Sequence, residues 1–390
     1  MKIVFVSNYI NHHQIPFCNA MYAKLGEDFT FIQMEPMEEE RIRMGWNPDD
    51  RPAYVKCGYQ DTEACAKLVM DSDVVIWGGA EDETFLKPRL EQKKPVIRYC
   101  ERLYRTGQWK AVSPRGLKKK YLDHTRYNKG PVCLLCAGAY VPSDFQIIRA
   151  YPGKKFRWGY FPETKSYNAD KLMEGKIPAQ ILWVARLIPL KHPELPIETA
   201  RYLREKGYQF HLNIVGGGEC EPMTAELIEK YNLQEYVTLC GVKTPEEVRG
   251  FMEEADVFLM TSDRNEGWGA VINEAMNSGC AVVANHMIGS VPFLLQHGRN
   301  GLIYRDGRKQ QLFELTERLI RDRDYCHRLG RSAYETIAQE WNAETAAERL
   351  CQLCERVFFG GGQQVPATGP CSVAPVISER AMYRHLMTEK

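Results

Sequence analysis

The sequence predicts an α/β protein of two domains, each built on a parallel β-sheet. The chain has 390 residues, of which 44% are hydrophobic, and this is enough for two domains of ordinary size. Short apolar runs alternate with amphipathic stretches almost from the first residue, which is typical of βα repetition and therefore of parallel sheets. These runs form two series, so we expect two separate sheets.

The expected strands can be placed along the chain. In the first series they lie at residues 2–7, 29–34, 74–77, 95–99 and 133–138. In the second series they lie at residues 179–186, 210–215, 237–240, 256–260, 281–284 and 302–304. The segment 161–178 between the series lacks strand or strong helix periodicity and looks like the crossing between domains. We therefore predict a first domain over residues 1–168 and a second over residues 169–340.

The end of the chain differs from both series. Residues 308–358 have a helical pattern with Trp341 in the middle, and we treat 341–359 as a C-terminal helix. A run of glycine and glutamine follows at 360–364, and after it a tail with Pro, Ala and Ser, so residues 360–390 are expected to be partly flexible. We find no repeat of fixed period, which excludes solenoids and propellers.

Composition excludes several classes of protein. The 51 Lys+Arg against 50 Asp+Glu leave no overall field that would favour nucleic acid. No apolar run approaches the ~20 residues that span a bilayer. The chain runs from Met1 straight into a strand without a signal peptide, and its 13 cysteines are scattered, which favours a reduced, cytoplasmic setting.

Two Cys-x-x-Cys pairs have a spacing found in zinc sites. We reject that interpretation for both. Cys133 and Cys136 lie in an expected strand, where an odd spacing puts their side chains on opposite faces. Cys351 and Cys354 lie on a helical pattern without nearby histidines. Core packing is the better interpretation of all four thiols, and no metal site is expected.

The most specific motif follows the expected strand 256–260. Glu266 and Glu274 lie eight residues apart and flank a loop that opens a helix, made of Gly267, Trp268 and Gly269. Small residues let the backbone approach a ligand, and the first N–H groups of a helix favour phosphate. Glu274 is expected to point into the same crevice at the carboxyl edge of the sheet. The alternative is that Glu266 caps the helix and Glu274 lies on its solvated face.

Two further loops follow strands of the second series and are expected at the same edge. Arg186 and Lys191 follow the first strand, and fixed cations stabilise a nucleoside diphosphate as it leaves. Gly217 and Gly218 lie in a glycine loop after the next strand, which would also let main chain approach a ligand. That signal alone is weak, because such turns are common.

Together these segments resemble the retaining glycosyltransferases of family 4. The resemblance covers about residues 179–305 and rests on Arg186-x4-Lys191, Gly216-Gly217-Gly218-Glu219, Val237 to Gly241, Ala255-Asp256-Val257, Thr261-Ser262 and Glu266-x7-Glu274. It implies a GT-B fold, in which two Rossmann-like domains with parallel sheets face each other across a cleft, and the second domain holds a sugar nucleotide. The 341–359 helix resembles the family segment that returns to the first domain.

The resemblance also implies roles for residues. Arg186 and Lys191 would bind the diphosphate, and Glu266, helped by the 267–269 amides, would orient the donor sugar. Glu274 would bind the ribose, and Val242 would line the base pocket. The expected reaction moves a sugar, with retention, from a nucleotide-diphosphate donor to a hydroxyl of a glycan or lipid-linked glycan in bacterial surface polysaccharide or glycolipid synthesis. The leaving phosphate would accept the acceptor proton, so neither a cofactor nor a metal is expected.

Other functions of the same fold stay open. A GT-B sugar-nucleotide epimerase and a glycan phosphorylase are alternatives among enzymes, although nothing resembles the lysine context of a pyridoxal-dependent phosphorylase. A non-catalytic partner that binds a sugar nucleotide or glycan is the alternative from another class. Two carboxylates with two cations favour a working transferase over these.

The first domain resembles the family less. The loop after its first strand contains His12 and His13, one of which is expected to contact the donor phosphate or the acceptor; the alternative is a surface feature at a helix start. Relatives often have a histidine after the strand expected at 95–99, where this chain has Glu101 and Arg102. Either could position the reactants, or the two could be a salt-bridged surface pair.

One stretch of the first domain is strongly basic. Between residues 98 and 129, cations alternate with aromatic and apolar residues such as Leu117 and Tyr121. Such runs are usually solvated helix faces. Cations mixed with apolar side chains also suit an anionic membrane surface, so peripheral contact through residues 98–129 is an open expectation.

Overall fold

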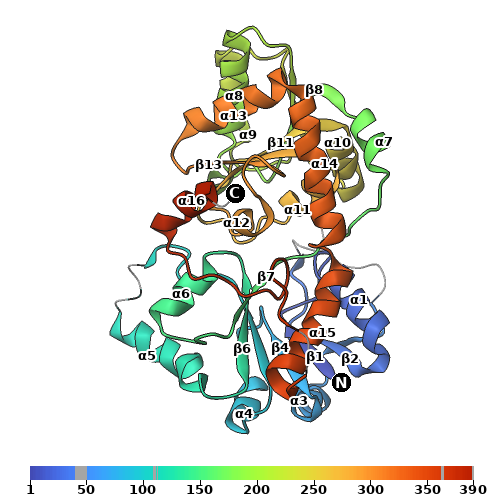
Figure 1. Ribbon diagram of the computed structural model, residues 1–390, viewed down its shortest axis with the longest axis vertical. Helices are drawn as coiled ribbons and strands as arrows, with labels where there is room; N and C mark the ends of the chain where they lie inside the picture. Colours follow the sequence, from blue (N-terminus) through green and yellow to red (C-terminus); the bar gives the residue numbers. More distant parts are fainter. Residues whose placement is uncertain (40–50, 109–110, 112, 362–363, 389–390) are drawn as a thin grey trace. The chain divides into compact units, whose positions relative to one another are not determined.

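The computed structural model describes residues 1–39, 51–108, 111, 113–361 and 364–388 (Figure 1). The chain forms two compact units, the first made of Met1–Glu163 and Trp341–Ile377 and the second of Thr164–Glu340 and Ser378–Lys390. The first division falls a few residues before the boundary expected at 168. The chain returns to the first unit at Trp341 and then enters the second unit again at Ser378.

The first unit is built on a parallel seven-stranded sheet. Its strands are β1 (Ile3–Ser7), β2 (Phe29–Gln33), β3 (Val55–Cys57), β4 (Val74–Trp77), β5 (Val96–Cys100), β6 (Val132–Ala137) and β7 (Lys155–Trp158), in the order β3-β2-β1-β4-β5-β6-β7. The apolar run of β1 is buried at every residue because β2 and β4 flank it. The edge strands β3 and β7 were not expected from the sequence.

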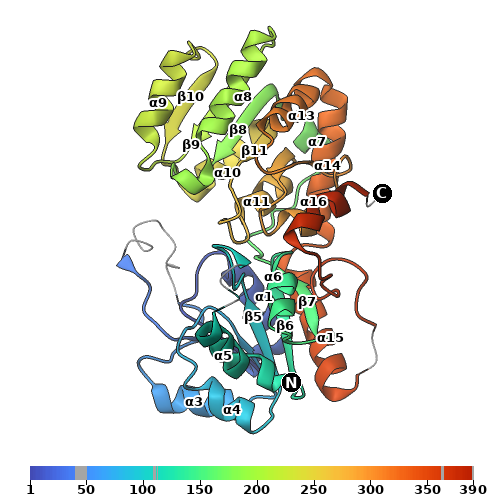
Figure 2. The same cartoon turned by 90° about the vertical axis from the view of Figure 1, so that its left-hand side faces the viewer.

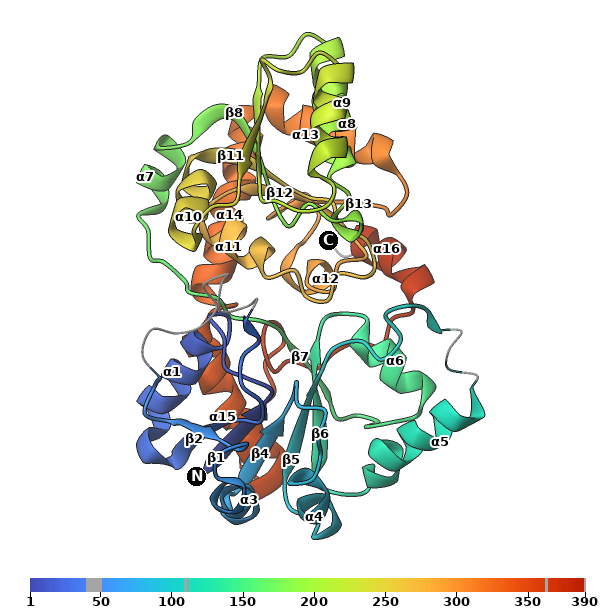
Figure 3. The same ribbon diagram turned by 180° about the vertical axis from the view of Figure 1, so that it is seen from behind.

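The helices of the first unit differ in how far they are buried. They are α1 (Ile15–Leu25), α3 (Thr62–Asp71), α4 (Leu86–Glu91), α5 (Pro114–Asp123), α6 (Val141–Ile147) and α15 (Ala343–Phe359). Helix α5 starts at the cap residue Ser113, buries none of its residues and lies on the outside of the unit (Figure 2). Helices α1 and α15 lie side by side (Figure 3).

The second unit has a parallel six-stranded sheet. Its strands are β8 (Ile177–Val184), β9 (His211–Val215), β10 (Val237–Gly241), β11 (Ala255–Met260), β12 (Ala281–Asn285) and β13 (Leu302–Tyr304), in the order β10-β9-β8-β11-β12-β13. Its helices are α7 (Ala169–Glu174), α8 (Glu194–Glu205), α9 (Glu221–Lys230), α10 (Pro245–Glu254), α11 (Val271–Asn277), α12 (Val291–Leu294), α13 (Lys309–Arg321) and α14 (Arg323–Gln339). Helix α7 lies in the segment where no periodicity was seen.

The end of the chain differs from the expected pattern. Trp341 lies in the break between α14 and α15, because Asn342 caps α15 through its side-chain bond to the Thr345 N–H at 2.8 Å. Beyond α15, Phe156 of β7 forms an antiparallel bridge with Val373.

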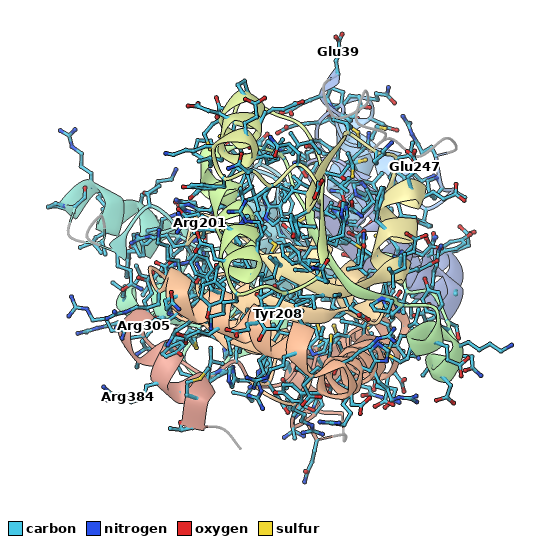
Figure 4. All side chains as sticks on the ribbon, turned by 90° about the horizontal axis from the view of Figure 1, so that it is seen from above. Glu39, Arg201, Tyr208, Glu247, Arg305 and Arg384 are labelled. Atoms are coloured by element: carbon cyan, nitrogen blue, oxygen red, sulfur yellow. The ribbon has the colours of Figure 1, made fainter. Side chains whose placement is uncertain are left out.

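The chain ends in α16 (Glu379–Thr388), a helix of the second unit. There the Tyr383 ring lies 5.3 Å from the His286 ring and 6.0 Å from the Arg305 guanidinium, and Figure 4 labels Arg305 and, on α16, Arg384. The described part of the tail therefore contains the bridge at Val373 and helix α16; that residues 360–390 are partly flexible stays a prediction. Gly362, Gln363, Glu389 and Lys390 lie outside the described residues of this tail, with the first two in the glycine run.

The six strands of the second sheet follow the same order as the first six strands of the first sheet, which has β7 in addition, and each sheet has one point where the strand order reverses. This point lies between β1 and β4 in the first sheet and between β8 and β11 in the second. In doubly wound sheets, ligands bind beyond the carboxyl ends of the strands at this point. The topology confirms the predicted α/β fold with two Rossmann-like halves, and it directs attention to the loops after β8 and β11.

Candidate functional site

The loops after β8 and β11 are joined through their main chains. The Thr261 hydroxyl donates to the carbonyl of Lys191 at 2.7 Å, and the Asp263 N–H donates to the carbonyl of Leu190 at 3.0 Å. In the interior, the Trp183 indole N–H donates to the Thr261 hydroxyl oxygen at 2.8 Å. These bonds hold the segment that carries Lys191 against the end of β11.

Two of the predicted site residues meet here. Lys191 and Glu266 form an ion pair, and only 15% and 13% of their side-chain surfaces are exposed. Water screens such a pair less than an exposed one, so the contact fixes both side chains. The sequence placed both residues at one sheet edge, and the structure brings their charged groups into contact.

Arg186 and Glu274 are placed differently. Arg186 is exposed, and among the described residues its side chain has no hydrogen-bond or ion-pair partner. Glu274 lies on α11 and is partly buried; its carboxylate likewise has no such partner within the described part of the chain. Burial raises the pKa of Glu274, and the charge of Arg249 opposes this rise. Both side chains therefore retain capacity to bind a ligand.

The glycine loop after β9 mainly serves the packing of the protein itself. A Cβ at Gly216 would lie 1.9 Å from the Ala185 carbonyl oxygen, and one at Gly218 would lie 2.5 Å from the Leu187 carbonyl oxygen. We expected the backbone of this loop to approach a ligand. At Gly216 and Gly218 it instead approaches the backbone of the loop after β8. Gly217 differs, because a Cβ there would lie 3.0 Å from Cγ2 of Val242.

Val242 has 80% of its surface exposed, so it and Gly217 form an accessible pair. The structure thus brings these two predicted residues together beside the ends of β9 and β10.

Trp268 belongs to the loop that precedes α11. Its side chain is buried, and the indole N–H donates to the Asn273 Oδ1 at 2.8 Å. The carbonyls of Gly267 and Trp268 accept hydrogen bonds from the N–H groups of Gly289 and Ser290 at 3.1 and 3.2 Å. Gly269 has φ +79°, a conformation that favours glycine. The loop that precedes α11 is therefore fixed from both sides.

His192 and Asp263 belong to this site but were not expected from the sequence. His192 directly follows Lys191, and its Nε2 lies 3.6 Å from Oδ2 of Asp263. Neither residue stands out in the sequence, because a single histidine and a single aspartate in loops are usually solvated. Only the pairing of the two loops shows that they meet.

In the first unit, His13 and Glu101 both lie beside Tyr160. The ring centroids of His13 and Tyr160 lie 6.2 Å apart with an angle of 18° between the planes, and the Tyr160 hydroxyl donates to the Glu101 carboxylate. Glu101 is also ion-paired with Arg105. Tyr160 comes directly after β7, a strand that the sequence did not reveal, and so it was missed.

The two adjacent histidines after β1 are held uncharged. Burial lowers the pKa of His12, and it lowers the pKa of His13 to about 3, with a further contribution from the charge of His12. Their ring centroids lie 3.8 Å apart. At neutral pH, both rings are therefore neutral groups that can exchange hydrogen bonds with hydroxyls.

Arg102 has a structural role that corrects one expectation. Its guanidinium pairs with Asp144 of α6 at 3.2 Å, and the two side chains are only 3% and 0% exposed. Asp144 also accepts from the Tyr104 N–H at 3.1 Å and from the Gln108 amide at 3.0 Å. The alternative of a Glu101–Arg102 surface pair is therefore wrong, because each residue has a different partner.

The basic stretch at 98–129 is less uniform than its composition suggests. Arg98 is buried and paired with Glu83, so it does not belong to a surface patch. Trp109 and Lys110 lie outside the described residues. The exposed cations that remain are concentrated on and just after α5, at Arg115, Lys118, Lys119, Arg126 and Lys129.

The described residues contain no candidate metal cluster, no disulfide and no helix that could cross a membrane. Within the described ranges, no cluster of three or more His, Cys, Asp or Glu could hold a metal ion. All 13 cysteines are described and are free thiols, and both Cys-x-x-Cys pairs are buried. None of the helices in the described part of the chain is both long and apolar enough to cross a membrane.

Comparison with known proteins finds a similarity that is concentrated in the second half of the chain. Residues 168–336 match the model of the glycosyl transferases group 1. The amylovoran biosynthesis glycosyltransferase AmsK of Erwinia amylovora is 31% identical over 219 residues, which are 54% of this chain and 53% of AmsK. The putative colanic acid biosynthesis glycosyltransferase WcaL of Salmonella typhimurium is 30% identical over 187 residues, 46% of each chain. The chain spans about half the length of these curated relatives.

Solved structures extend the likeness to both units. The crystal structure of HepE of Anabaena in complex with UDP has a TM-score of 0.66 and 16% identity, and the match covers 91% of this chain and 100% of that chain. At this identity the likeness shows the fold alone. The chain therefore has the GT-B fold, and its residues 168–336 are similar to the glycosyl transferases group 1.

Proposed function

We propose that this chain is a retaining glycosyltransferase that moves a sugar from a nucleoside-diphosphate donor to a hydroxyl of a glycan or lipid-linked glycan. The observation that supports this best is the Lys191–Glu266 ion pair at the strand-order reversal of the second sheet, with Arg186 exposed on the same loop. Cations suit a diphosphate, and a carboxylate suits sugar hydroxyls. One small region thus offers both kinds of group.

The proposed reaction uses these charges where negative charge develops. The bond between the sugar C1 and the phosphate oxygen breaks, and Lys191 and Arg186 stabilise the departing diphosphate. The acceptor oxygen attacks C1 from the same face and forms the new C–O bond. Its proton passes to the departing phosphate oxygen, so no side-chain nucleophile and no metal ion are required. Glu266 would orient the donor sugar.

The rest of the donor would extend along the same edge. Glu274, whose carboxylate has no protein partner among the described residues, would accept hydrogen bonds from the ribose hydroxyls. Gly217 and Val242 adjoin beside β9 and β10, where an exposed apolar surface suits one face of a base. These roles follow the resemblance to family 4, residue by residue.

The acceptor would be held by the first unit. His13, Tyr160 and Glu101 form a connected group that combines a neutral imidazole with a carboxylate. Such a group can donate and accept hydrogen bonds to sugar hydroxyls without carrying a cation. AmsK and WcaL are named for amylovoran and colanic acid biosynthesis, and we extend that setting to this chain as bacterial surface polysaccharide or glycolipid synthesis in the cytoplasm.

Contact with an anionic membrane surface would bring a lipid-linked acceptor to the enzyme. Helix α5 buries none of its residues, and Leu117, Tyr121 and Leu122 are 40%, 55% and 41% exposed beside its lysines. Each cation near an anionic lipid surface adds about 1 kcal/mol of attraction. The Lys118→Glu/Lys119→Glu variant should bind phosphatidylglycerol vesicles at least about tenfold more weakly than the native chain. As a control with equal charge change, Lys67→Glu/Lys87→Glu should bind like the native chain; equal binding by both variants would exclude α5.

A panel of sugar nucleotides tests the main proposal. We expect transfer to a glycan acceptor from one donor, with the anomeric configuration retained in the product by NMR, at the same rate with and without EDTA. Loss of activity in EDTA that Mg²⁺ restores would overturn the metal-free mechanism. Donor binding without turnover would identify a non-catalytic partner, and conversion of the donor to a stereoisomer would identify an epimerase.

A further inference from the structure

His192 has a backbone conformation that side chains rarely adopt. It ends the short 3-10 turn Pro189–Lys191 in the left-handed region, with φ 51° and ψ 59°. A residue with a Cβ is less stable there than glycine. Strain of this kind persists where the surroundings hold it, and it often marks a functional position. The strained backbone therefore suggests that the histidine directly after Lys191 has a function.

The histidine side chain connects the two loops of the candidate site. Its Nδ1 lies 2.7 Å from Oε1 of Glu194, at the start of α8. Its Nε2 lies 3.6 Å from Oδ2 of Asp263, on the loop after β11. The imidazole thus stands between two carboxylates, one from each loop, and both of its nitrogens face an acceptor.

Asp263 carries this contact on to Glu266. The Asp263 carbonyl accepts the Glu266 N–H at 3.1 Å, which closes a turn. Since Glu266 pairs with Lys191, and Lys191 precedes His192, these four residues form a closed ring. Two contacts between charged groups, Lys191–Glu266 and His192–Asp263, join the loop after β8 to the loop after β11.

We infer that His192 is a positioning residue, which holds Lys191 and Glu266 in place for the donor through its contact with Asp263. This inference rests on the proposed function, because it assumes that Lys191 and Glu266 bind a sugar nucleotide. His192 itself touches neither the donor nor the reacting atoms in this role. This positioning role explains why a histidine occupies a position where glycine would have less backbone strain.

The contact works best when the imidazole is protonated. The hydrogen bond to Glu194 raises the pKa of His192, and the charges of Glu194, Asp263 and Asp306 raise it further, while burial opposes them. A raised pKa means that the imidazolium is present below this pKa and is lost as the pH rises through it. Donor binding should therefore weaken at alkaline pH, and the change should appear in KM for the donor more than in kcat.

The test compares His192→Asn with the native enzyme between pH 6 and 9. Asparagine tolerates the left-handed conformation and does not ionise in this range. In the native enzyme, KM for the donor should rise about two- to fivefold across the titration, the effect expected of a partly exposed ion pair. His192→Asn should have the higher KM at every pH, without this rise. Titration of the free donor phosphates affects both enzymes equally.

His327→Asn provides a matched control, since His327 also faces a carboxylate, Asp256 at 3.0 Å, but lies away from the ring. It should keep the native profile. His192→Gly relieves the backbone and removes the side chain, so it should resemble His192→Asn; if it binds the donor as the native enzyme does, the side chain is not needed and the inference is overturned.

A native pH profile in His192→Asn overturns the inference as well. Lys191→Ala separates this failure from a failure of the proposed function. If Lys191→Ala abolishes donor binding while His192→Asn behaves as native, only the role of His192 is wrong. If Lys191→Ala binds and turns over the donor normally, the site itself is wrong, and the inference falls with it.

Discussion

Lys191 and Glu266 form an ion pair that joins the loop after β8 to the loop after β11. In the absence of a donor, each charge therefore satisfies the other. A diphosphate that binds to Lys191 and a sugar that binds to Glu266 would share these charges and would find them already in place. Preorganised charges of this kind stabilise a transition state without the cost of assembling them during the reaction.

Lys191→Ala and Arg186→Ala should both lower kcat/KM, but only the first should lower stability. Each removes a cation from the developing diphosphate, and we expect a loss of about 10²- to 10³-fold, the range found for a lost donor at a developing anion. Lys191→Ala also leaves Glu266 mostly buried without its partner, whereas Arg186 is exposed. Steady-state kinetics with thermal unfolding checks both effects; native rates in both variants would contradict the site.

Gly216→Ala should destabilise the second unit strongly. A Cβ there would lie 1.9 Å from the Ala185 carbonyl oxygen, and Gly216 has φ +138°. Either the loop after β8 or that after β9 must move, so donor binding should be lost as well. Gly250→Ala on α10 is the control, because nothing lies within 4 Å of its Cβ. At Gly250, alanine should raise the free energy of unfolding by up to about 1 kcal/mol. Equal effects of Gly216→Ala and Gly250→Ala on stability would exclude the packing role of Gly216.

Asp144→Asn should destabilise the first unit by about 3–5 kcal/mol, because it removes the negative charge from a buried ion pair with Arg102. Chemical denaturation would measure this loss. Glu101→Gln should leave stability nearly unchanged, since Glu101 is partly exposed, and should instead raise KM for the acceptor. If Glu101→Gln were the more destabilising change, the assignment of the two neighbours would be reversed.

His13 should act without changing its charge. Because burial lowers its pKa to about 3, it stays neutral from pH 5 to 9 in this structure. His13→Asn should therefore lower turnover by a similar factor at every pH in that range. A rate that depends on pH in the native enzyme but not in His13→Asn would show that His13 gains a proton during catalysis.

The strands were predictable where an apolar run is buried by neighbours on both sides, as in β1 and β11. The edge strands β3 and β7 were not, because each carries cations that interrupt its apolar run: Lys56 in β3, and Lys155 and Arg157 in β7. Because β7 was not predicted, Tyr160 was not recognised as the residue that connects His13 to Glu101. Local pattern is weakest where pairing with a distant segment decides the structure.

The site shows a similar division. The spacing of Glu266 from Glu274 and of Arg186 from Lys191 was readable, because each pair belongs to one loop or one loop–helix unit. The sequence did not show that the backbone at Gly216 and Gly218 approaches the loop after β8, because this depends on which segment of backbone lies opposite these residues. The contact of His192 with Asp263 was equally hidden, because it depends on the adjacency of β8 and β11.

Glu274 has an energetic cost that its proposed role explains. Burial raises the pKa of its carboxyl, and no hydrogen-bond or ion-pair partner of the carboxylate is present among the described residues. A raised pKa means that the ionised form is less stable in the folded protein than in the unfolded chain. The stability linked to this group is therefore present when it is protonated and decreases as the pH rises through the raised pKa.

Glu274→Gln should thus stabilise the ligand-free protein at pH 7 while it weakens binding of the free nucleoside diphosphate. We expect Tm to rise by about 2 °C, the shift that a fraction of a kcal/mol to 1 kcal/mol gives in a domain of this size. Glu266→Gln, in contrast, should impair transfer more than binding, because a contact near the reacting carbon strengthens as charge develops there. Titration of UDP, GDP and ADP into both variants, with unfolding curves, measures each effect. If Glu266→Gln abolishes diphosphate binding while Glu274→Gln leaves it intact, the two roles are reversed; if neither variant changes binding or transfer, neither glutamate contacts the donor.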